Sequence, residues 1–435
     1  MSLLRRLFDL PALDPSVKAS FRREQITETT LPIAVSMMEG GFVAVVAAKT
    51  FDVPAWVLAV ISASPMFGNL SSFVWNRVGS ARPKVRMVVT LQSLVLLCLV
   101  AIALSPRSQA GAWVLVAAVI SSRLLIAGIT TARSVAWSLN YGRTLRARAT
   151  GRLQMIASFT TVTATGIAAL VMDAHPESFR YLYAAAAVIG CIGVWSFSHV
   201  VVVGEKRQRV LERRGDSDES GKNSFLAILR RDRNYAKYQL YQFVSGVAAM
   251  MLEPVLVYLI TRQLHASYAA SIAITMLIPF SMNVLTLPLW ARYLDRVHVA
   301  EFRARQNAVW VLGILILWWG AVEGSLWWLA AGRVIVGIVN GGGSLAWQLG
   351  HNDFAPKDQL TAYMGIHVTL TGIRGAFAPF LGTALYLGWE THGALPGLAG
   401  IGHYVFLMSA ILGVVAWLGF DRLRKRISKR PRREL

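Results

Sequence analysis

The sequence predicts an all-α polytopic membrane protein with twelve transmembrane helices in two six-helix, pseudo-symmetric bundles. Hydrophobic residues make up 55% of the 435 residues and charged residues only 15%, against roughly 45–50% and about 25% in ordinary soluble domains. The apolar stretches are continuous, which favours helices, because lipid-facing barrel strands alternate apolar and polar residues. Landmarks of the first half also recur in the second half, which indicates an internal duplication.

Twelve apolar segments are candidates for membrane helices, each of which needs about 20 mostly apolar residues. Their approximate ranges are 30–50, 55–76, 85–105, 112–138, 152–172, 180–203, 239–261, 267–290, 307–322, 326–349, 360–387 and 400–420. The ninth segment is the shortest. Its Trp310, Trp318 and Trp319 suit the membrane interfaces, where indole rings anchor helices.

The duplication is visible as matched motifs. Met37-x-Glu39 recurs as Met251-x-Glu253, 214 residues later, and Pro65-x-x-x-Asn69 recurs at the same spacing as Pro279-x-x-x-Asn283. Further on the spacing becomes 210, and the matched pairs are Arg123 and Arg333, Ser134 and Ser344, Ala136 and Ala346, Trp137 and Trp347, and Leu139 and Leu349. Two related halves of apolar helices are typical of secondary transporters, whose substrate site lies between the repeats.

The segments outside the helices complete the predicted domain organisation. We expect a cytoplasmic lead-in at 1–28, a helix bundle at 29–203, a central loop at 204–237, a second bundle at 238–420 and a basic tail at 421–435. The lead-in lacks the uninterrupted apolar core of a cleaved signal peptide. Within the central loop, residues 215–221 read as a flexible linker and residues 225–238 as an amphipathic surface helix.

The net charge of +21 is distributed unevenly. If the N-terminus is cytoplasmic, 36 of the 44 lysines and arginines fall on the cytoplasmic side, which is the positive-inside pattern. We therefore expect a multi-pass protein of the cytoplasmic (inner) membrane with both termini in the cytoplasm. Anionic lipid headgroups account for the basic tail, so no nucleic-acid partner is expected. We expect a monomer.

Six ionisable side chains fall inside the predicted helices, and such groups should face a partner or a wet cavity, because burying each in lipid costs roughly 2.5–3.5 kcal/mol. They are Glu39, Arg123, Arg133, Glu253, Arg333 and Arg374. Helical spacing places Arg333, Asn340 and Trp347 on one face, and His367 and Arg374 on another. The candidate residues for substrate and proton translocation are Glu39, Arg123, Glu253, Arg333, Arg374, His367, Asn69, Asn283, Asn340, Trp137 and Trp347.

With these features the chain resembles the major facilitator superfamily. The loop motif of that family has imperfect counterparts here, Asn76-Arg77-Val78-Gly79 and Leu294-Asp295-Arg296-Val297-His298, while Arg333 and Gly337 match a second signature. The resemblance implies the major facilitator fold, with the first, fourth, seventh and tenth helices around a cavity. It also implies that Asp295 and Arg296 form a gating latch; for Arg77 a role in topology is the stronger reading.

The embedded charges leave two interpretations open. Glu39 and Glu253 are either a proton-coupling pair or members of fixed ion pairs with Arg123 and Arg333. Arg374 either anchors an anionic group of the substrate, or snorkels or binds backbone carbonyls. Four embedded arginines against two glutamates favour an anionic or zwitterionic substrate.

The predicted function is secondary active transport of a small organic solute by alternating access, with protons as the expected coupling ion. One alternative is a proton-driven exporter of drugs or lipophiles, although the glycine-proline signature of that subclass is missing from residues 152–172. Others, from a different class, are a membrane sensor without transport and a polytopic membrane enzyme. The sequence has no phosphate-binding loop for ATP and no Cys/His metal spacing, so we expect no enzyme activity, cofactor or metal.

Overall fold

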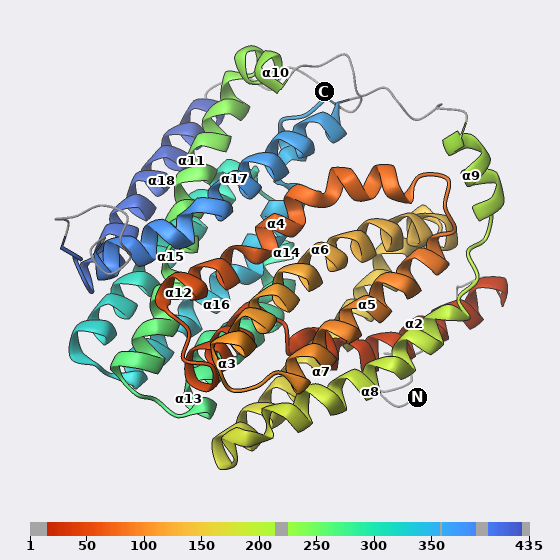
Figure 1. Ribbon diagram of the computed structural model, residues 1–435. Coiled ribbons are helices and arrows are strands. Elements are labelled where there is room, and N and C mark those ends of the chain that lie inside the picture. The colour runs from red at the N-terminus through yellow and green to blue at the C-terminus, as the bar shows by residue number, and fades with distance from the viewer. Residues whose placement is uncertain (1–14, 214–224, 357–358, 389–398, 429–435) are drawn as a thin grey trace, which may run out of the picture. The chain divides into compact units, whose positions relative to one another are not determined.

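Long helices account for nearly all of the residues that the structure describes. The computed structural model describes residues 15–213, 225–356, 359–388 and 399–428, and its regular elements are helices apart from one bridge between Gly388 and Ala399 (Figure 1). Within these ranges, eleven helices are long and apolar enough to cross a membrane. The 25-residue helix α4 (Ala55–Gly79) occupies the remaining predicted segment. The predicted fold class is confirmed.

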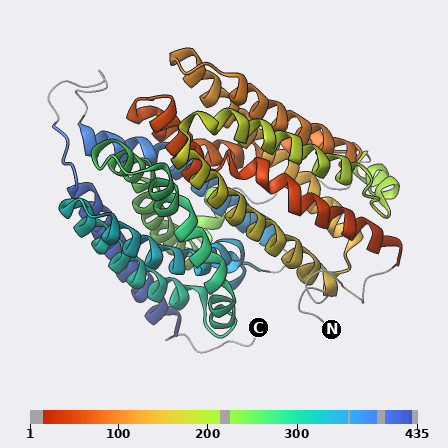
Figure 2. The ribbon, with the colours of Figure 1, turned by 90° about the horizontal axis from the view of Figure 1, so that it is seen from below.

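The first compact unit comprises residues 1–53 and 67–218. Besides the end of α4, its helices are α2 (Pro15–Ser36), α3 (Gly40–Thr50), α5 (Lys84–Leu104), α6 (Gln109–Asn140), α7 (Arg143–Ala174), a 3₁₀ turn (Pro176–Ser178), α8 (Phe179–Ser198) and α9 (Glu205–Arg213). Helix α5 packs against α6 and α8, and α2 packs against α7 and α8 (Figures 1 and 2).

The first membrane helix begins well before the predicted residue 30. α2 starts at Pro15, and together with α3 it forms a candidate span from Val17 to Thr50. Much of the expected cytoplasmic lead-in is therefore helix. The reason is an inward-facing stripe at steps of three and four, in which every member is buried: Val17, Phe21, Glu24, Glu28 and Leu31.

The second compact unit comprises residues 54–66 and 219–435. Its helices are α10 (Phe225–Arg231), α11 (Arg233–Met250), α12 (Leu252–Tyr258), α13 (Tyr268–Ile272), α14 (Ile278–Leu294), α15 (Val299–Glu323), α16 (Leu326–Leu349), α17 (Leu360–Leu387) and α18 (Tyr404–Ser428), with π-helical turns at Leu259–Gln263 and Ala273–Leu277 and a 3₁₀ turn at Gly350–Asp353. Helix α15 packs against α16 and α18, and α11 packs against α17 and α18.

Several boundaries differ from the sequence-based ranges. The predicted surface helix ends at Arg231, because Asp232 accepts hydrogen bonds from the N–H groups of Asn234 and Tyr235 and so caps α11. The start of α4 groups with the second unit, where the side chain of Met66 lies against Gly375. Part of the lead-in, the linker at 215–221, Lys357 and the end of the tail lie outside the described residues.

Candidate functional site

The first membrane helix of each half is interrupted next to its glutamate. α2 ends at Ser36, and Glu39 adopts an extended conformation (φ −72°, ψ 142°) as the N-cap residue of α3. In the second half the break falls at Met251, which places Glu253 in the first turn of α12. A carboxylate at a helix start is favoured by the positive end of the helix dipole. The breaks thus give both acids similar surroundings.

In the first half, Glu39 is paired with an arginine of α6. The Nη1 of Arg123 donates to Oε1 of Glu39 at 2.9 Å, and its Nη2 donates to the carbonyl of Met38 at 2.6 Å. That carbonyl is close to the helix break, where the backbone ladder is interrupted. Arg123 therefore binds both the acid and the backbone of the break.

The second half repeats this pair. The Nη1 of Arg333 on α16 donates to Oε1 of Glu253 at 3.1 Å. Its Nε and Nη2 donate to the carbonyls of Ile274 and Thr275, at 3.1 and 2.8 Å. Both carbonyls belong to the π-helical turn Ala273–Leu277, a geometry that departs from the regular α-helical ladder.

Burial is divided unequally within the two pairs. The side chains of Arg123 and Arg333 are 8% and 7% exposed, whereas those of Glu39 and Glu253 are 41% and 47% exposed. Each arginine is thus held inside its helix bundle by the pair, while each carboxylate remains accessible. Both fixed pairs considered from the sequence are present in this conformation.

A second charged cluster lies between α2 and α6, and the sequence analysis missed its two acids. Glu24, 1% exposed, accepts hydrogen bonds from Nε1 of Trp137 at 2.5 Å and from the hydroxyl of Tyr141 at 2.7 Å. Arg133 approaches Glu24 to 3.5 Å and forms a shorter ion pair with Glu28. The guanidinium of Arg133 also lies over the Trp137 ring, 4.7 Å from its centroid. We name these five residues the acid cluster.

The charges of the acid cluster do not balance. Glu24 and Glu28 share one basic partner, Arg133. A buried pair of carboxylates with one guanidinium carries one surplus negative charge when both acids are ionised, and like charges at short range oppose this state. The cluster is therefore chemically able to hold one proton.

In the second half, the buried charges near α11 are positive. Arg374 of α17 is 4% exposed and donates to the carbonyl of Gln242, while Nδ1 of His367 lies 3.2 Å from Oε1 of Gln239. Arg303 of α15, counted from the sequence only as a topology signal, is 6% exposed and bonded to its neighbour Gln306. Its burial shows that it is not merely a loop charge.

The other predicted translocation residues have individual surroundings. Trp137 belongs to the acid cluster, and Nε1 of Trp347 donates to the hydroxyl of Thr371 at 3.2 Å. Asn69 and Asn283 are half-buried at matching places in α4 and α14, and Asn340 is exposed on α16. The role of these three amides in translocation stays a prediction.

The predicted gating residues lie at helix ends. Arg77 is in the last turn of α4, and Asp295 and Arg296 follow α14. All three are exposed, and within the described residues their side chains form neither hydrogen bonds nor ion pairs with other side chains. This conformation gives no contact that would act as a latch.

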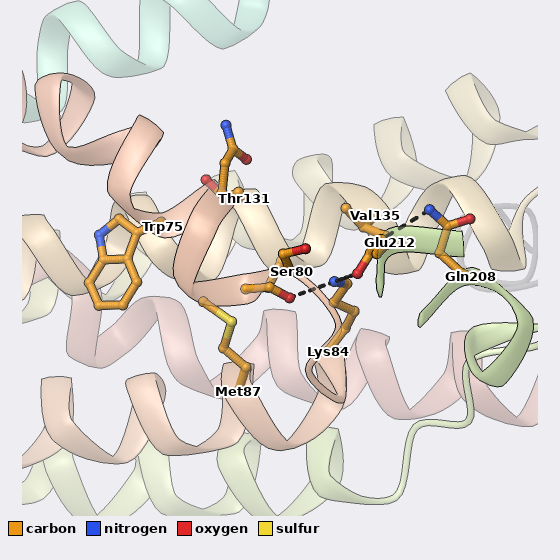
Figure 3. A pocket seen from close by; sticks show the side chains of 11 residues that line it. Trp75, Ser80, Lys84, Met87, Thr131, Val135, Gln208 and Glu212 are labelled. Carbon is orange, nitrogen blue, oxygen red and sulfur yellow. Dashed lines mark hydrogen bonds and ion pairs between the residues drawn. The ribbon is translucent and has the colours of Figure 1, made fainter. Parts of the chain in front are cut away.

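A different contact secures the turn between α4 and α5. Helix α9 places Glu212 against this turn, where it accepts from Nζ of Lys84 and from the N–H of Ala81, at 2.9 and 2.6 Å (Figure 3). Burial opposes ionisation of Glu212, but these hydrogen bonds and the charge of Lys84 outweigh it and lower the pKa of the carboxyl. A pocket of about 180 Å³ opens beside the pair, lined also by Trp75 and Gln208.

The donor atoms of both halves suit charged solutes and protons better than metals. In the ranges that the structure describes, there is no group of three or more His, Cys, Asp or Glu side chains that could hold a metal ion. The buried charged groups of the pairs and clusters described above are guanidinium and carboxyl groups. Such groups bind anions, zwitterions and protons.

Comparisons with known proteins agree with this fold. A family model described as Major Facilitator Superfamily matches residues 238–434. A point mutant of the nucleoside transporter NupG superimposes with a TM-score of 0.68 at 10% identity, over 93% of this chain and 99% of that one. A point mutant of the peptide transporter POT, in complex with sulfate, gives 0.67 at 14% identity, over 93% and 95%. A D-xylose-proton symporter gives 0.64 at 12% identity, over 94% and 97%.

The curated proteins contain no significant sequence match to the chain. The structural matches are below 25% identity, so they show the fold. The chain thus matches the major facilitator family model over residues 238–434 and shares the fold of these solved transporters over nearly its whole length.

Proposed function

We propose that the chain is a secondary active transporter that moves a small organic solute across the cytoplasmic membrane by alternating access, with the proton as coupling ion. The duplicated ion pair supports this most directly. In each half, an arginine of the fourth helix binds the glutamate at the break in the first helix. Repeats with discontinuous helices that carry charged groups are a common design of secondary transporters.

The two repeat pairs and the acid cluster have different roles in this proposal. Glu39–Arg123 and Glu253–Arg333 are balanced, so each holds its helix break without a proton. Their accessible carboxylates are placed to exchange partners as the conformation changes. Glu24 and Glu28 share one arginine, so the acid cluster is the stronger candidate for the proton.

The charge inventory supports an anionic or zwitterionic solute. The charged side chains of the repeat pairs and of the groups around them are Glu24, Glu28, Glu39, Arg123 and Arg133 in the first half, and Glu253, Arg303, Arg333 and Arg374 in the second. With one proton on the acid cluster, the first half is neutral and the second carries two surplus positive charges. A negatively charged solute would offset them.

Topology and assembly follow the sequence argument. The excess of basic residues on one side supports cytoplasmic termini and a multi-pass arrangement in the inner membrane. Arg77, Asp295 and Arg296 are then cytoplasmic, where they would form gating contacts in another conformation of the cycle. The proposed unit of transport is the monomer, with the lipid bilayer as its surroundings.

The test starts from the purified full-length protein. Thermal stability is measured against pools of organic anions, amino acids, sugars and lipophilic cations, and uptake of any stabilising solute into liposomes is then measured with and without a pH gradient. The proposal predicts stabilisation by an anion or zwitterion and uptake that the gradient accelerates. Stabilisation by lipophilic cations alone would contradict it in favour of a drug exporter.

Glutamine variants separate the carboxylates. Glu24→Gln and Glu28→Gln are expected to abolish acceleration by the pH gradient while solute exchange continues. Glu323→Gln, an exposed acid at the end of α15, is the matched control and should behave as wild type. Undiminished coupling in both cluster variants would exclude the acid cluster. Loss of coupling in Glu39→Gln or Glu253→Gln instead would assign the proton to the repeat pairs.

A further inference from the structure

Buried polar side chains of α11, α15 and α17 meet in the second compact unit. α11 contributes Tyr238, Gln239 and Gln242, α15 contributes Arg303, and α17 contributes His367 and Arg374. Each is less than a tenth exposed. Hydrogen-bond contacts join Arg374 to the Gln242 carbonyl and His367 to the Gln239 side chain, and Arg303 is the nearby cation that acts electrostatically on Tyr238. We name these six residues the cationic cluster.

The positive charges of the cationic cluster have no carboxylate partner among the residues that the structure describes. Arg374 is bonded to a backbone carbonyl, and Arg303 to Oε1 of Gln306 at 2.8 Å and the carbonyl of Gly343 at 3.4 Å. Buried like charges without a counterion are unfavourable. A bound anion would therefore stabilise this arrangement.

Two acids of the same compact unit, Asp353 and Asp232, are engaged in other contacts. Asp353 accepts from the N–H of Val299 at 2.7 Å and lies 4.0 Å from His298. Asp232 caps α11 and accepts from the hydroxyl of Tyr363 at 3.2 Å. Neither carboxylate forms an ion pair with a cluster arginine, so rearranging them would cost an existing helix contact.

Several polar atoms of the cationic cluster are buried without a hydrogen-bond partner. They are Nε of Arg303, Nε of Arg374, Nε2 of His367, Nε2 of Gln239, Oε1 of Gln242 and the hydroxyl of Tyr238. Buried polar groups in folded proteins are almost always satisfied. Three of these atoms, Nε of Arg303, Nε of Arg374 and Nε2 of Gln239, are donors. An oxyanion would supply the acceptors that they lack.

A glycine makes room for one of the guanidinium groups. A Cβ atom built on Gly246 of α11 would lie 2.2 Å from Cζ of Arg374. Only glycine allows the guanidinium to lie directly against the α11 backbone. The close approach brings Arg374 beside Gln242, one turn earlier on the same helix.

We infer that the cationic cluster is an oxyanion-binding site that takes a carboxylate or phosphate group of the solute. Arg303 and Arg374 supply the charge, and the amide of Gln239 supplies a further donor. That the bound group belongs to the transported solute rests on the proposed function, whereas anion binding itself does not. The substrate class is therefore small organic anions with at least one such group.

The binding test uses the full chain in lipid nanodiscs. Succinate, its uncharged analogue succinamide, and inorganic phosphate are titrated while the unfolding temperature and the heat of binding are recorded. The inference predicts saturable binding of succinate, phosphate or both, and none of succinamide. Binding of only one anion identifies the group as carboxylate or phosphate. Equal binding of succinamide, or no binding of either anion, would overturn the inference.

Arginine variants locate the site. Arg303→Gln and Arg374→Gln should each weaken anion binding about tenfold or more, because a charge-assisted contact is lost. Arg374→Lys, which keeps the charge but not the planar donors, should bind with intermediate affinity. Arg292, an exposed residue of α14, lies outside the cluster. The Arg292→Gln variant also loses one positive charge, and it should bind the anion as wild type does. Undiminished affinity in both glutamine variants would overturn the inference.

Transport measurements keep the two proposals apart. Anion binding that depends on Arg303 and Arg374, without uptake into liposomes, would refute transport and leave the site in place. Uptake that continues unchanged in both glutamine variants would refute the site and leave transport in place.

Discussion

The two halves of this protein share one ion pair and differ in nearly every other buried charge. Both hold an arginine of the fourth helix against the glutamate of a broken first helix. At the spacing of 214 residues, Glu24 and Glu28 of the first half correspond to Tyr238 and Gln242 of the second. The same two helix positions thus serve an acid cluster in one half and a cationic cluster in the other.

The difference suggests that the two halves have different roles, although their architecture is duplicated. The repeat pairs hold the helix breaks, which both halves need. The positions around them have opposite charge, which suits binding of a proton in one half and of an anion in the other. The sign of the charge around the repeat pairs thus distinguishes the halves.

Removing the shared arginine of the acid cluster should have the largest effect on stability. Arg133→Gln leaves Glu24 and Glu28 buried without a cation, which costs roughly 3–5 kcal/mol. Arg374→Gln removes a surplus charge from the other half and should leave the anion-free protein as stable or more stable. Thermal unfolding in detergent compares the two. Equal destabilisation by both variants would contradict the charge difference.

A second substitution tests the reason for that loss. Adding Glu28→Gln to Arg133→Gln removes one of the uncompensated acids and should restore a large part of the unfolding temperature. An additive loss in the double variant would show that Arg133 acts through packing on Trp137 and Phe197 instead.

The close approach of Arg374 to Gly246 in the cationic cluster can be tested by adding a methyl group. Gly246→Ala forces a methyl group into the Arg374 guanidinium, and overpacking of this kind typically costs about 1–3 kcal/mol. Anion binding should weaken as well. Gly365→Ala in α17 meets no atom within 4 Å and should be neutral or stabilising. Similar unfolding temperatures for the two variants would refute the close approach.

The two repeat pairs should contribute slightly different amounts to the stability of the fold. Arg333 binds one carboxylate and two carbonyls, whereas Arg123 binds one of each. Arg333→Gln should therefore destabilise more than Arg123→Gln, by about 1 kcal/mol, which is the typical net value of one hydrogen bond. Thermal unfolding of both variants measures the gap, and a reversed order would argue against the observed bonding.

The smallest expected effect is the loss, at low pH, of the contact that holds α9 through Glu212. The pKa of Glu212 is lowered in the folded state, so its contribution is complete above its unfolded pKa, near 4.5, and declines as the pH falls through the lowered folded value. Limited proteolysis of α9 should thus accelerate only in acid. Glu212→Gln should be cleaved faster at neutral pH as well. Cleavage rates that do not respond to acid or to the substitution would exclude this contact.

The membrane helices could be predicted from the sequence because continuous apolar runs dominate their composition. The structure places α16 and α17 at 326–349 and 360–387, the ranges predicted. The start of α2 could not be predicted from hydropathy, since Arg22 and Arg23 make that segment polar. Its periodic stripe from Val17 to Leu31 contained the missing signal.

The charged clusters were only partly predictable. The repeat gave the pairing of Glu39 with Arg123 as one interpretation, and Arg374 stood out because its helix lacked an acid. Arg303 looked like a cytoplasmic topology signal, since it lies near the start of its helix. Which atoms remain without partners depends on side-chain packing among three helices, and a single sequence does not determine it.

The protonation state of the acid cluster is the most direct test of the account. Infrared spectra of the purified protein at neutral pH report the C=O stretch of protonated carboxyl groups. The difference spectrum of wild type minus Glu28→Gln or minus Glu24→Gln should contain such a band, while wild type minus Glu323→Gln should not. If neither cluster variant loses a protonated-carboxyl band, both acids are ionised and the proposed proton site does not exist.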